Sequence, residues 1–131
     1  MRADPAFAET LSGALAGYGP RQCIQFEGRW HTGDQITGYI DAIGHALRDL
    51  GPAEPVALVV RNRVPHAAAI LGSIADGRPV SMVYSYQSPQ AIARDVESIA
   101  PAGVIADPED WSSELAGAAR SVGAAGITLG A

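Results

Sequence analysis

Runs of apolar residues and helically spaced apolar residues predict alternating strands and helices over most of the chain. Val56–Val60 is a continuous apolar run, which is typical of a strand covered on both faces in a parallel sheet. A helix is predicted from Pro65 to about Ala75, followed by a stop signal at Gly77. A second apolar run, Val80–Tyr84, follows at once, so this stretch predicts a strand–helix–strand unit. The apolar face of its helix is expected to be Ala67, Ile70, Leu71 and Ile74.

The same alternation continues to the end of the chain. Ser88 can cap a further helix, and Pro101 ends it. Two more short strands are predicted, at Gly103–Ala106 and Gly126–Leu129. The helix that Ser88 caps carries an apolar stripe of Ile92, Val96 and Ile99. The last helix is capped by Asp110 or Ser112 and carries Leu115, Ala118, Ala119 and Val122 on one face.

The first fifty residues predict a helix, a β-hairpin and a longer helix. Asp4–Gly17 begins with a capping Asp. Cys23–Thr32 alternates like a hairpin, whose two-residue turn is Glu27-Gly28. Thr32 and Gln35 have capping-box spacing and open a helix that ends at Gly51-Pro52. The apolar face of the first helix is Phe7, Leu11 and Leu15. The stripe of the longer helix is Ile36, Tyr39, Ile40, Ile43, Leu47 and Leu50.

These elements predict an α/β fold, with a β-hairpin followed by repeated strand–helix units that form a parallel, doubly wound sheet. The strands begin near residues 56, 80, 103 and 126, a spacing that also suits a solenoid. A solenoid is rejected because the units share no Leu/Asn consensus and each helix has its own caps and stripe. We expect residues 1–20 to form an N-terminal arm and residues 21–131 an α/β subdomain. Because a domain seldom finishes on an apolar strand, we also expect a piece of a longer polypeptide.

Composition narrows the classes of function. The 131 residues are 47% hydrophobic and 18% charged, which indicates a globular domain. The net charge is −5 and all nine basic residues are Arg, so no basic footprint for nucleic acid is expected. The single cysteine, Cys23, allows no internal disulfide. Because the chain has no bilayer-length apolar run and no signal peptide, we expect a cytoplasmic protein without a membrane span.

Basic residues that directly follow the first buried strand are candidates for cofactor binding. Ligands of open α/β sheets bind outside the carboxyl ends of strands, and helix N-termini favour anions. Arg61, Asn62 and Arg63 are therefore candidates for a phosphate or CoA contact. The favoured structural interpretation is that Asn62 caps the next helix while the arginines are solvated or pair with carboxylates.

Three residues at the end of the second strand are candidates for substrate binding. Tyr84, Ser85 and Tyr86 could line an acyl or pantetheine channel, although packing under a neighbouring subdomain is the favoured interpretation. No metal site is predicted, because the three histidines lack ligand-like spacing, and no residue is assigned a catalytic role. Those histidines are His31, His45 and His66.

A series of motifs between residues 22 and 110 carries a family resemblance. In order they are Phe26-Glu27-Gly28-Arg29-Trp30 with Thr32, Ala46–Gly51, Val56–Asn62, Ala67–Gly77 with Pro79-Val80, Ser88-Pro89 to Ile99, and Val104–Asp107. Together they resemble the N-terminal part of the AMP-forming adenylating enzymes, which include acyl-CoA synthetases and aryl-acid ligases. The chain departs from the family at Gly33-Asp34-Gln35, where Tyr and Glu are frequent, and at Ser85-Tyr86-Gln87, where many members have Asn-Pro.

The resemblance implies that a full-length enzyme would use ATP, Mg and CoA to activate a fatty or aryl acid and transfer it to a thiol. The family's phosphate loop is absent here, and its lysine roles cannot be filled without any Lys. The resemblance therefore implies a scaffold fragment that is inactive alone and holds no cofactor of its own. Its partner would be the remainder of its own polypeptide, and self-association through the last strand is also expected. The alternative is a stand-alone, non-catalytic α/β interaction module.

Overall fold

The computed structural model describes residues 4–51 and 53–129 and divides them into two compact units. The sheet unit contains residues 53–61 and 79–129. The helical unit contains residues 4–51 and 62–78. The chain therefore leaves the sheet unit after the first parallel strand and returns to it for the second.

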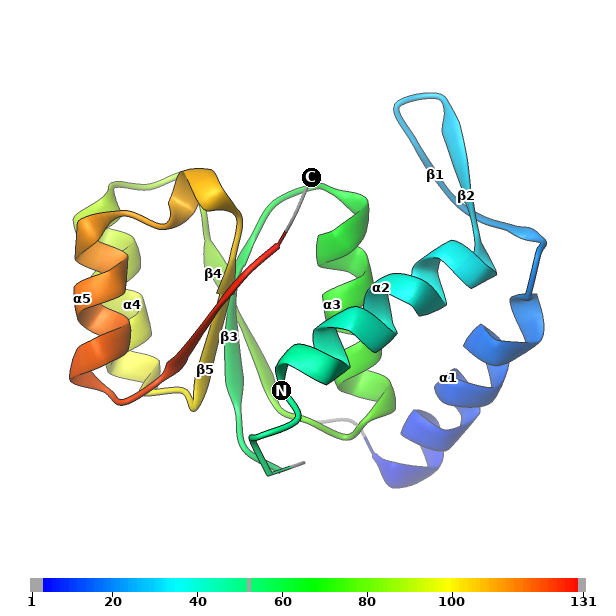
Figure 1. Ribbon diagram of the computed structural model, residues 1–131, viewed down its shortest axis with the longest axis horizontal. Helices are drawn as coiled ribbons and strands as arrows, with labels where there is room; N and C mark the ends of the chain where they lie inside the picture. Colours follow the sequence, from blue (N-terminus) through cyan, green and yellow to red (C-terminus); the bar gives the residue numbers. More distant parts are fainter. Residues whose placement is uncertain (1–3, 52, 130–131) are drawn as a thin grey trace. The chain divides into compact units, whose positions relative to one another are not determined.

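The sheet unit is built on four parallel strands. They are β3 (Val56–Val60), β4 (Val80–Tyr84), β5 (Gly103–Ala106) and β6 (Ala125–Thr128). Their spatial order is β4-β3-β5-β6, so β3 and β5 are central and β4 and β6 are the edges (Figure 1). Four consecutive residues of β3 are buried, as its unbroken apolar run predicted. The parallel sheet and three of the four predicted strand ranges are confirmed, and the last strand is shifted by one residue.

Two helices cover one face of this sheet. They are α4 (Pro89–Ile99) and α5 (Ser113–Ser121), which lie side by side in Figure 1. Both begin as expected, because Ser88 Oγ accepts from Ala91 N–H at 3.1 Å and Ser112 Oγ from Leu115 N–H at 3.0 Å. Ser112, not Asp110, is thus the cap of α5. The buried core between these two helices and the sheet comprises Ala57, Val59, Val83, Ile92, Ala93, Val96, Val104, Ala106, Leu115, Ala118 and Ala119.

The helical unit holds the hairpin and three helices. They are α1 (Pro5–Tyr18), α2 (Gly33–Ala46) and α3 (Val64–Ala75), with the hairpin strands β1 (Gln22–Phe26) and β2 (Arg29–Thr32). The hairpin turn is the one predicted, since Glu27 and Gly28 both have positive φ, 51° and 77°. The capping box of α2 also forms: Thr32 N–H donates to Gln35 Oε1 at 2.8 Å, and Gln35 N–H to Thr32 Oγ1 at 3.2 Å.

Three local predictions in the helical unit are wrong. The helix expected to reach Gly51 ends at Ala46, because the chain continues in turns in which Leu50 N–H donates to Leu47 C=O. Phe7 is 55% exposed, and Ala8 takes its place on the buried face of α1. The expected apolar face of α3 is only half-buried. Its buried residues are Val64, His66, Ala68, Ala69, Gly72 and Ser73, mostly small side chains that allow a close helix contact.

Gly33 marks the tightest junction in the helical unit. A Cβ on Gly33 would contact Tyr18 Cβ and would lie 2.9 Å from the Gly19 carbonyl oxygen. The same junction is closed by two main-chain bonds, Gly33 N–H to Arg21 C=O at 3.0 Å and Asp34 N–H to Gly19 C=O at 2.7 Å. Only glycine fits at the start of α2 without moving the end of α1.

We expect Gly33→Ala to lower the free energy of unfolding by about 2 kcal/mol, because the added methyl group meets backbone that cannot turn away. Gly38→Ala on the same helix is the matched control. Nothing lies within 4 Å of the position of its Cβ, so the higher helix propensity of Ala should stabilise the fold by up to about 1 kcal/mol. Urea unfolding measures both, and equal effects of the two substitutions would contradict the steric argument.

Candidate functional site

The carboxyl ends of β3, β4 and β5 form one edge of the sheet, and a polar segment follows each of them. Arg61 follows β3, Ser85 follows β4, and a single 3-10 turn, Pro108–Asp110, follows β5. Ligands of open α/β sheets bind at this edge, where the strand order changes direction. Because β3 has β4 on one side and β5 on the other, that position lies beyond the ends of β3 and β5.

An ion pair occupies this position. Arg61 Nε donates to Asp110 Oδ2 at 2.7 Å and Arg61 Nη2 to Asp110 Oδ1 at 2.9 Å, a bidentate arrangement. A third contact joins Arg61 Nη1 to Glu109 Oε2 at 3.8 Å. The Asp110 side chain is 6% exposed and that of Arg61 is 20% exposed. The pair therefore links the end of β3 to the turn after β5, and both side chains are largely shielded from water.

The electrostatics of this pair do not suit an incoming phosphate. The hydrogen bonds to Asp110 raise the pKa of Arg61, and the nearby charges of Asp110 and Glu109 add to the effect, so the guanidinium stays charged. One guanidinium faces two carboxylates, which leaves a net negative charge at the edge. An anion would have to displace Asp110 and leave that carboxylate buried without its partner. Of the two sequence interpretations of Arg61, the structure favours pairing with carboxylates.

The predicted tyrosines lie beside this ion pair. The Arg61 guanidinium carbon is 5.9 Å from the centroid of the Tyr86 ring, within the range of a cation–π contact. The Tyr84 and Tyr86 rings are 5.6 Å apart and tilted by 60°. Both rings remain largely exposed, at 62% and 69%. They form an open aromatic surface at the end of β4.

Ser85 differs from its two neighbours because it is buried, at 7% exposure. Its Oγ has no hydrogen-bond partner among the residues that the structure describes. A buried hydroxyl without a partner typically costs about 1–3 kcal/mol, so such groups are rare in folded proteins. The structure thus brings Arg61, Ser85 and the two tyrosines to one edge, as the sequence predicted.

The other two predicted residues belong to the helical unit. Arg63, not Asn62, is the N-cap residue of α3, and no side chain caps that helix end. The expectation that Asn62 caps the helix is therefore wrong. The helix begins at Val64 with Pro65 in its first turn, so the cap position falls on the residue after Asn62.

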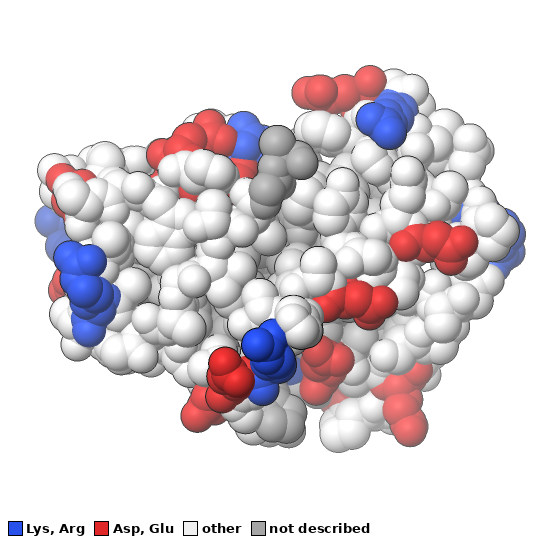
Figure 2. All heavy atoms as spheres, in the orientation of Figure 1, with Lys and Arg blue, Asp and Glu red and all other residues white. Residues whose placement is uncertain are grey.

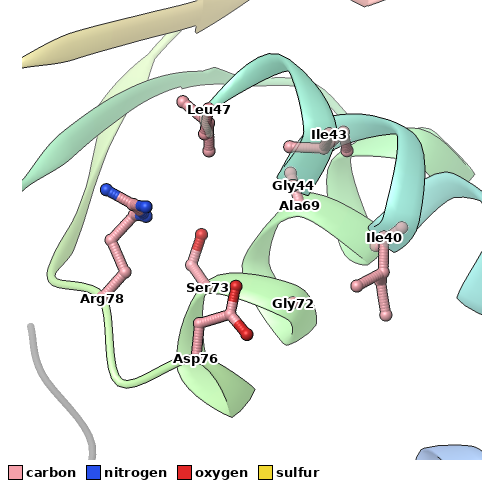
Figure 3. A pocket seen from close by; sticks show the side chains of 10 residues that line it. Ile40, Ile43, Gly44, Leu47, Ala69, Gly72, Ser73, Asp76 and Arg78 are labelled. Atoms are coloured by element: carbon pink, nitrogen blue, oxygen red, sulfur yellow. The ribbon is translucent and has the colours of Figure 1, made fainter. Parts of the chain in front are cut away.

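The helical unit also contains a small cavity between α2 and α3. Figure 3 shows Ser73, Asp76 and Arg78 around it, opposite Ile40, Ile43 and Leu47. Arg78 is buried and its Nη1 donates to the Gly51 carbonyl at 3.1 Å, which anchors the chain after α2. The volume open to the centre of a water molecule is about 10 Å³, enough for one water at most. The cavity cannot hold a substrate.

Metal binding and membrane insertion find no support in the described part of the chain. Among residues 4–51 and 53–129, no group of three or more His, Cys, Asp or Glu side chains is placed to hold a metal ion. No helix in the same ranges is long and apolar enough to cross a bilayer. Figure 2 shows Arg side chains dispersed among Asp and Glu on the face in view, without a basic patch.

The fold itself is shared with known enzymes. The chain matches a benzoate CoA ligase from Burkholderia xenovorans LB400 with a TM-score of 0.76 and 21% identity, over 95% of this chain and 26% of that one. ATP-bound MatB from Rhodopseudomonas palustris matches with a TM-score of 0.77 and 20% identity, over 99% and 26% of the two chains. The chain has the fold of a subdomain of adenylate-forming enzymes.

A third adenylate-forming neighbour is the anthranilate CoA ligase AuaEII in complex with anthranoyl-AMP. Its TM-score is 0.68 at 17% identity, over 88% of this chain and 22% of that one. The chain thus spans about a quarter of the length of the first ligases it matches. No family model and no curated protein matches the sequence. At these identities the likeness establishes the fold, which agrees with the resemblance found in the sequence.

The sequence pattern alone does not reveal the partner of Arg61. In the sequence, Asp110 is a candidate only for a helix cap. The acidic Pro108-Glu109-Asp110 segment after a strand was a usable signal, but nothing local indicates that β5 lies next to β3. That neighbourhood depends on the order of strands in the sheet.

We expect Arg61→Ala to lower the free energy of unfolding by about 3 kcal/mol, because it leaves Asp110 buried without its partner. Asp110→Ala removes the other half of the pair, and the double variant should lose less than the sum of the two single losses. Arg94→Ala, an exposed arginine on α4, is the control and should change stability by less than about 0.5 kcal/mol. Additive losses in urea unfolding would show that the two side chains do not interact.

Proposed function

We propose that this chain is the N-terminal scaffold of an ATP-dependent, AMP-forming ligase that joins a fatty or aryl acid to CoA. The observation that carries the proposal is the match to CoA ligases over 95–99% of this chain but only 26% of theirs. The order of the sequence motifs adds independent support. In this proposal the remainder of the ligase polypeptide is the partner of the chain and carries the chemistry.

The residues at the carboxyl edge do not fit ATP, Mg or CoA as a site of their own. Arg61 is held by Asp110 and Glu109, so the edge has no cation ready for a phosphate. The chain contains no Lys that could replace it. We therefore derive no catalytic step from these residues. Their role in the proposal is to fix the ends of the strands against which the remaining chain is built.

We expect the purified 131-residue chain to show no ATP–pyrophosphate exchange with benzoate, anthranilate or fatty acids. The physical reason is that neither a phosphate cradle nor a catalytic cation is available at the carboxyl edge. A full-length benzoate CoA ligase assayed in parallel with benzoate verifies the assay. Exchange by the chain alone that disappears in the Arg61→Ala variant would overturn the scaffold role.

The alternative function is a stand-alone interaction module, which the exposed Tyr84 and Tyr86 at the end of β4 favour. The reading frame after Ala131 in the source gene separates the two. Under the ligase proposal it should continue into a Ser/Thr/Gly-rich phosphate loop ending in Pro-Lys. A stop codon at that point would reject the ligase proposal and support the module.

A further inference from the structure

The outer edge of β4 is open in the sheet unit. Among the described residues, β4 has β3 on one side and no strand on the other. Val56 N–H donates to Pro79 C=O at 3.0 Å, so the main-chain groups of Pro79 face β3. Because the main-chain groups of successive residues point to opposite edges of a strand, the N–H and C=O of Met82 and the N–H of Tyr84 point outward, away from β3. The Tyr84 carbonyl instead accepts from Gln87 Nε2 at 2.8 Å.

This edge lacks the protection that natural proteins give to edge strands. Val80–Tyr84 contains no charged residue and no proline, and its pairing with β3 has no bulge. Six large apolar or aromatic side chains are exposed among the described residues. Three of them lie within five consecutive positions here, at Met82, Tyr84 and Tyr86. Such a cluster beside an open edge is typical of a surface that another segment covers.

A groove runs along the same edge, between β4 and α4. Its lining comprises Met82, Val83, Asp95, Ser98 and Ile99, and its volume is about 170 Å³. An apolar side chain entering the groove would lie between Val83 of β4 and Ile99 of α4. Asp95 at its rim already accepts from Gln87 Nε2 at 2.8 Å. The groove therefore favours an uncharged or basic occupant over an acidic one.

Ser85 supplies an independent sign of a missing partner. Its buried Oγ, at the position where β4 ends, has no hydrogen-bond partner in the described chain. A strand added beside β4 and continued past Tyr84 would bring main-chain N–H and C=O groups to this level of the sheet. The open edge and the unpartnered hydroxyl thus point to the same extended occupant.

We propose that the β4 edge is the docking site for a further β-strand, supplied by the part of the ligase polypeptide that lies outside these 131 residues. The inference rests on the proposed function. The ligases that match the chain are about four times as long, since it covers only 26% of them, so ample further chain belongs to that architecture. The added strand pairs with Met82, places an apolar side chain in the groove and offers Ser85 a hydrogen bond.

Amide hydrogen exchange at Met82 and Tyr84 tests the proposal. It is measured in the 131-residue chain, at a concentration where light scattering gives a monomer, and in the extended polypeptide encoded by the source gene. Exchange should be fast in the chain alone and at least about 100-fold slower in the extended protein, because pairing removes these amides from water. The buried amide of Val59 is the internal reference and should be slow in both.

Two substitutions provide a second readout. Met82→Asp should leave the unfolding midpoint of the chain alone nearly unchanged but lower that of the extended protein, and Gln90→Asp on the exposed side of α4 should change neither. Ser85→Ala should shift the midpoints in opposite directions. It raises the midpoint of the chain alone, by removing an unsatisfied hydroxyl, and lowers that of the extended protein, where the hydroxyl is bonded.

The outcomes separate this inference from the proposed function. If the gene continues into an active ligase but Met82 and Tyr84 exchange as fast as in the chain alone, the docking site is wrong and the ligase proposal stands. Slow exchange in the isolated monomer would also reject the docking site, because the edge would then not be open. A reading frame that stops after Ala131 overturns both.

Discussion

Two charge-assisted hydrogen bonds between Arg61 and Asp110 hold the carboxyl edge of the sheet together. They join the end of β3 to the turn after β5. The two strands are adjacent in the sheet, although Arg61 and Asp110 are 49 residues apart in the sequence. Both side chains are largely buried, so each depends on the other for compensation of its charge. The place where an open α/β sheet usually accepts a ligand is therefore filled by an internal contact.

This constraint explains why Arg61 is committed to an internal contact at this edge. Arg61 cannot serve an anion while Asp110 holds it in a bidentate pair, and Tyr86 lies against its guanidinium. What stays available is the neighbouring β4, with Met82 and the two tyrosines exposed. Beside the paired Arg61, the sheet unit thus exposes apolar and aromatic side chains at the end of β4.

Local sequence signals predicted most of the secondary structure because the physics behind them is local. The capping box at Thr32, the caps at Ser88 and Ser112 and the turn at Glu27-Gly28 all form from residues a few positions apart. Predictions failed where a contact between elements decided the outcome. Ala8 displaces Phe7 from the buried face of α1, whereas Asn62 misses the cap position for a local reason, because α3 begins one residue later.

The sequence by itself determined the parallel α/β class, the positions of its strands and the presence of polar residues at their carboxyl ends. Apolar runs, caps and glycine stops suffice for this, because burial and backbone geometry act within a few residues. Only the tertiary structure decided that β5 lies beside β3, so that Asp110 neutralises Arg61. It also decided that β4 is an edge strand beside Ser85 among the strands that the structure describes. Strand order brings together residues that are distant along the chain, and no local pattern records it.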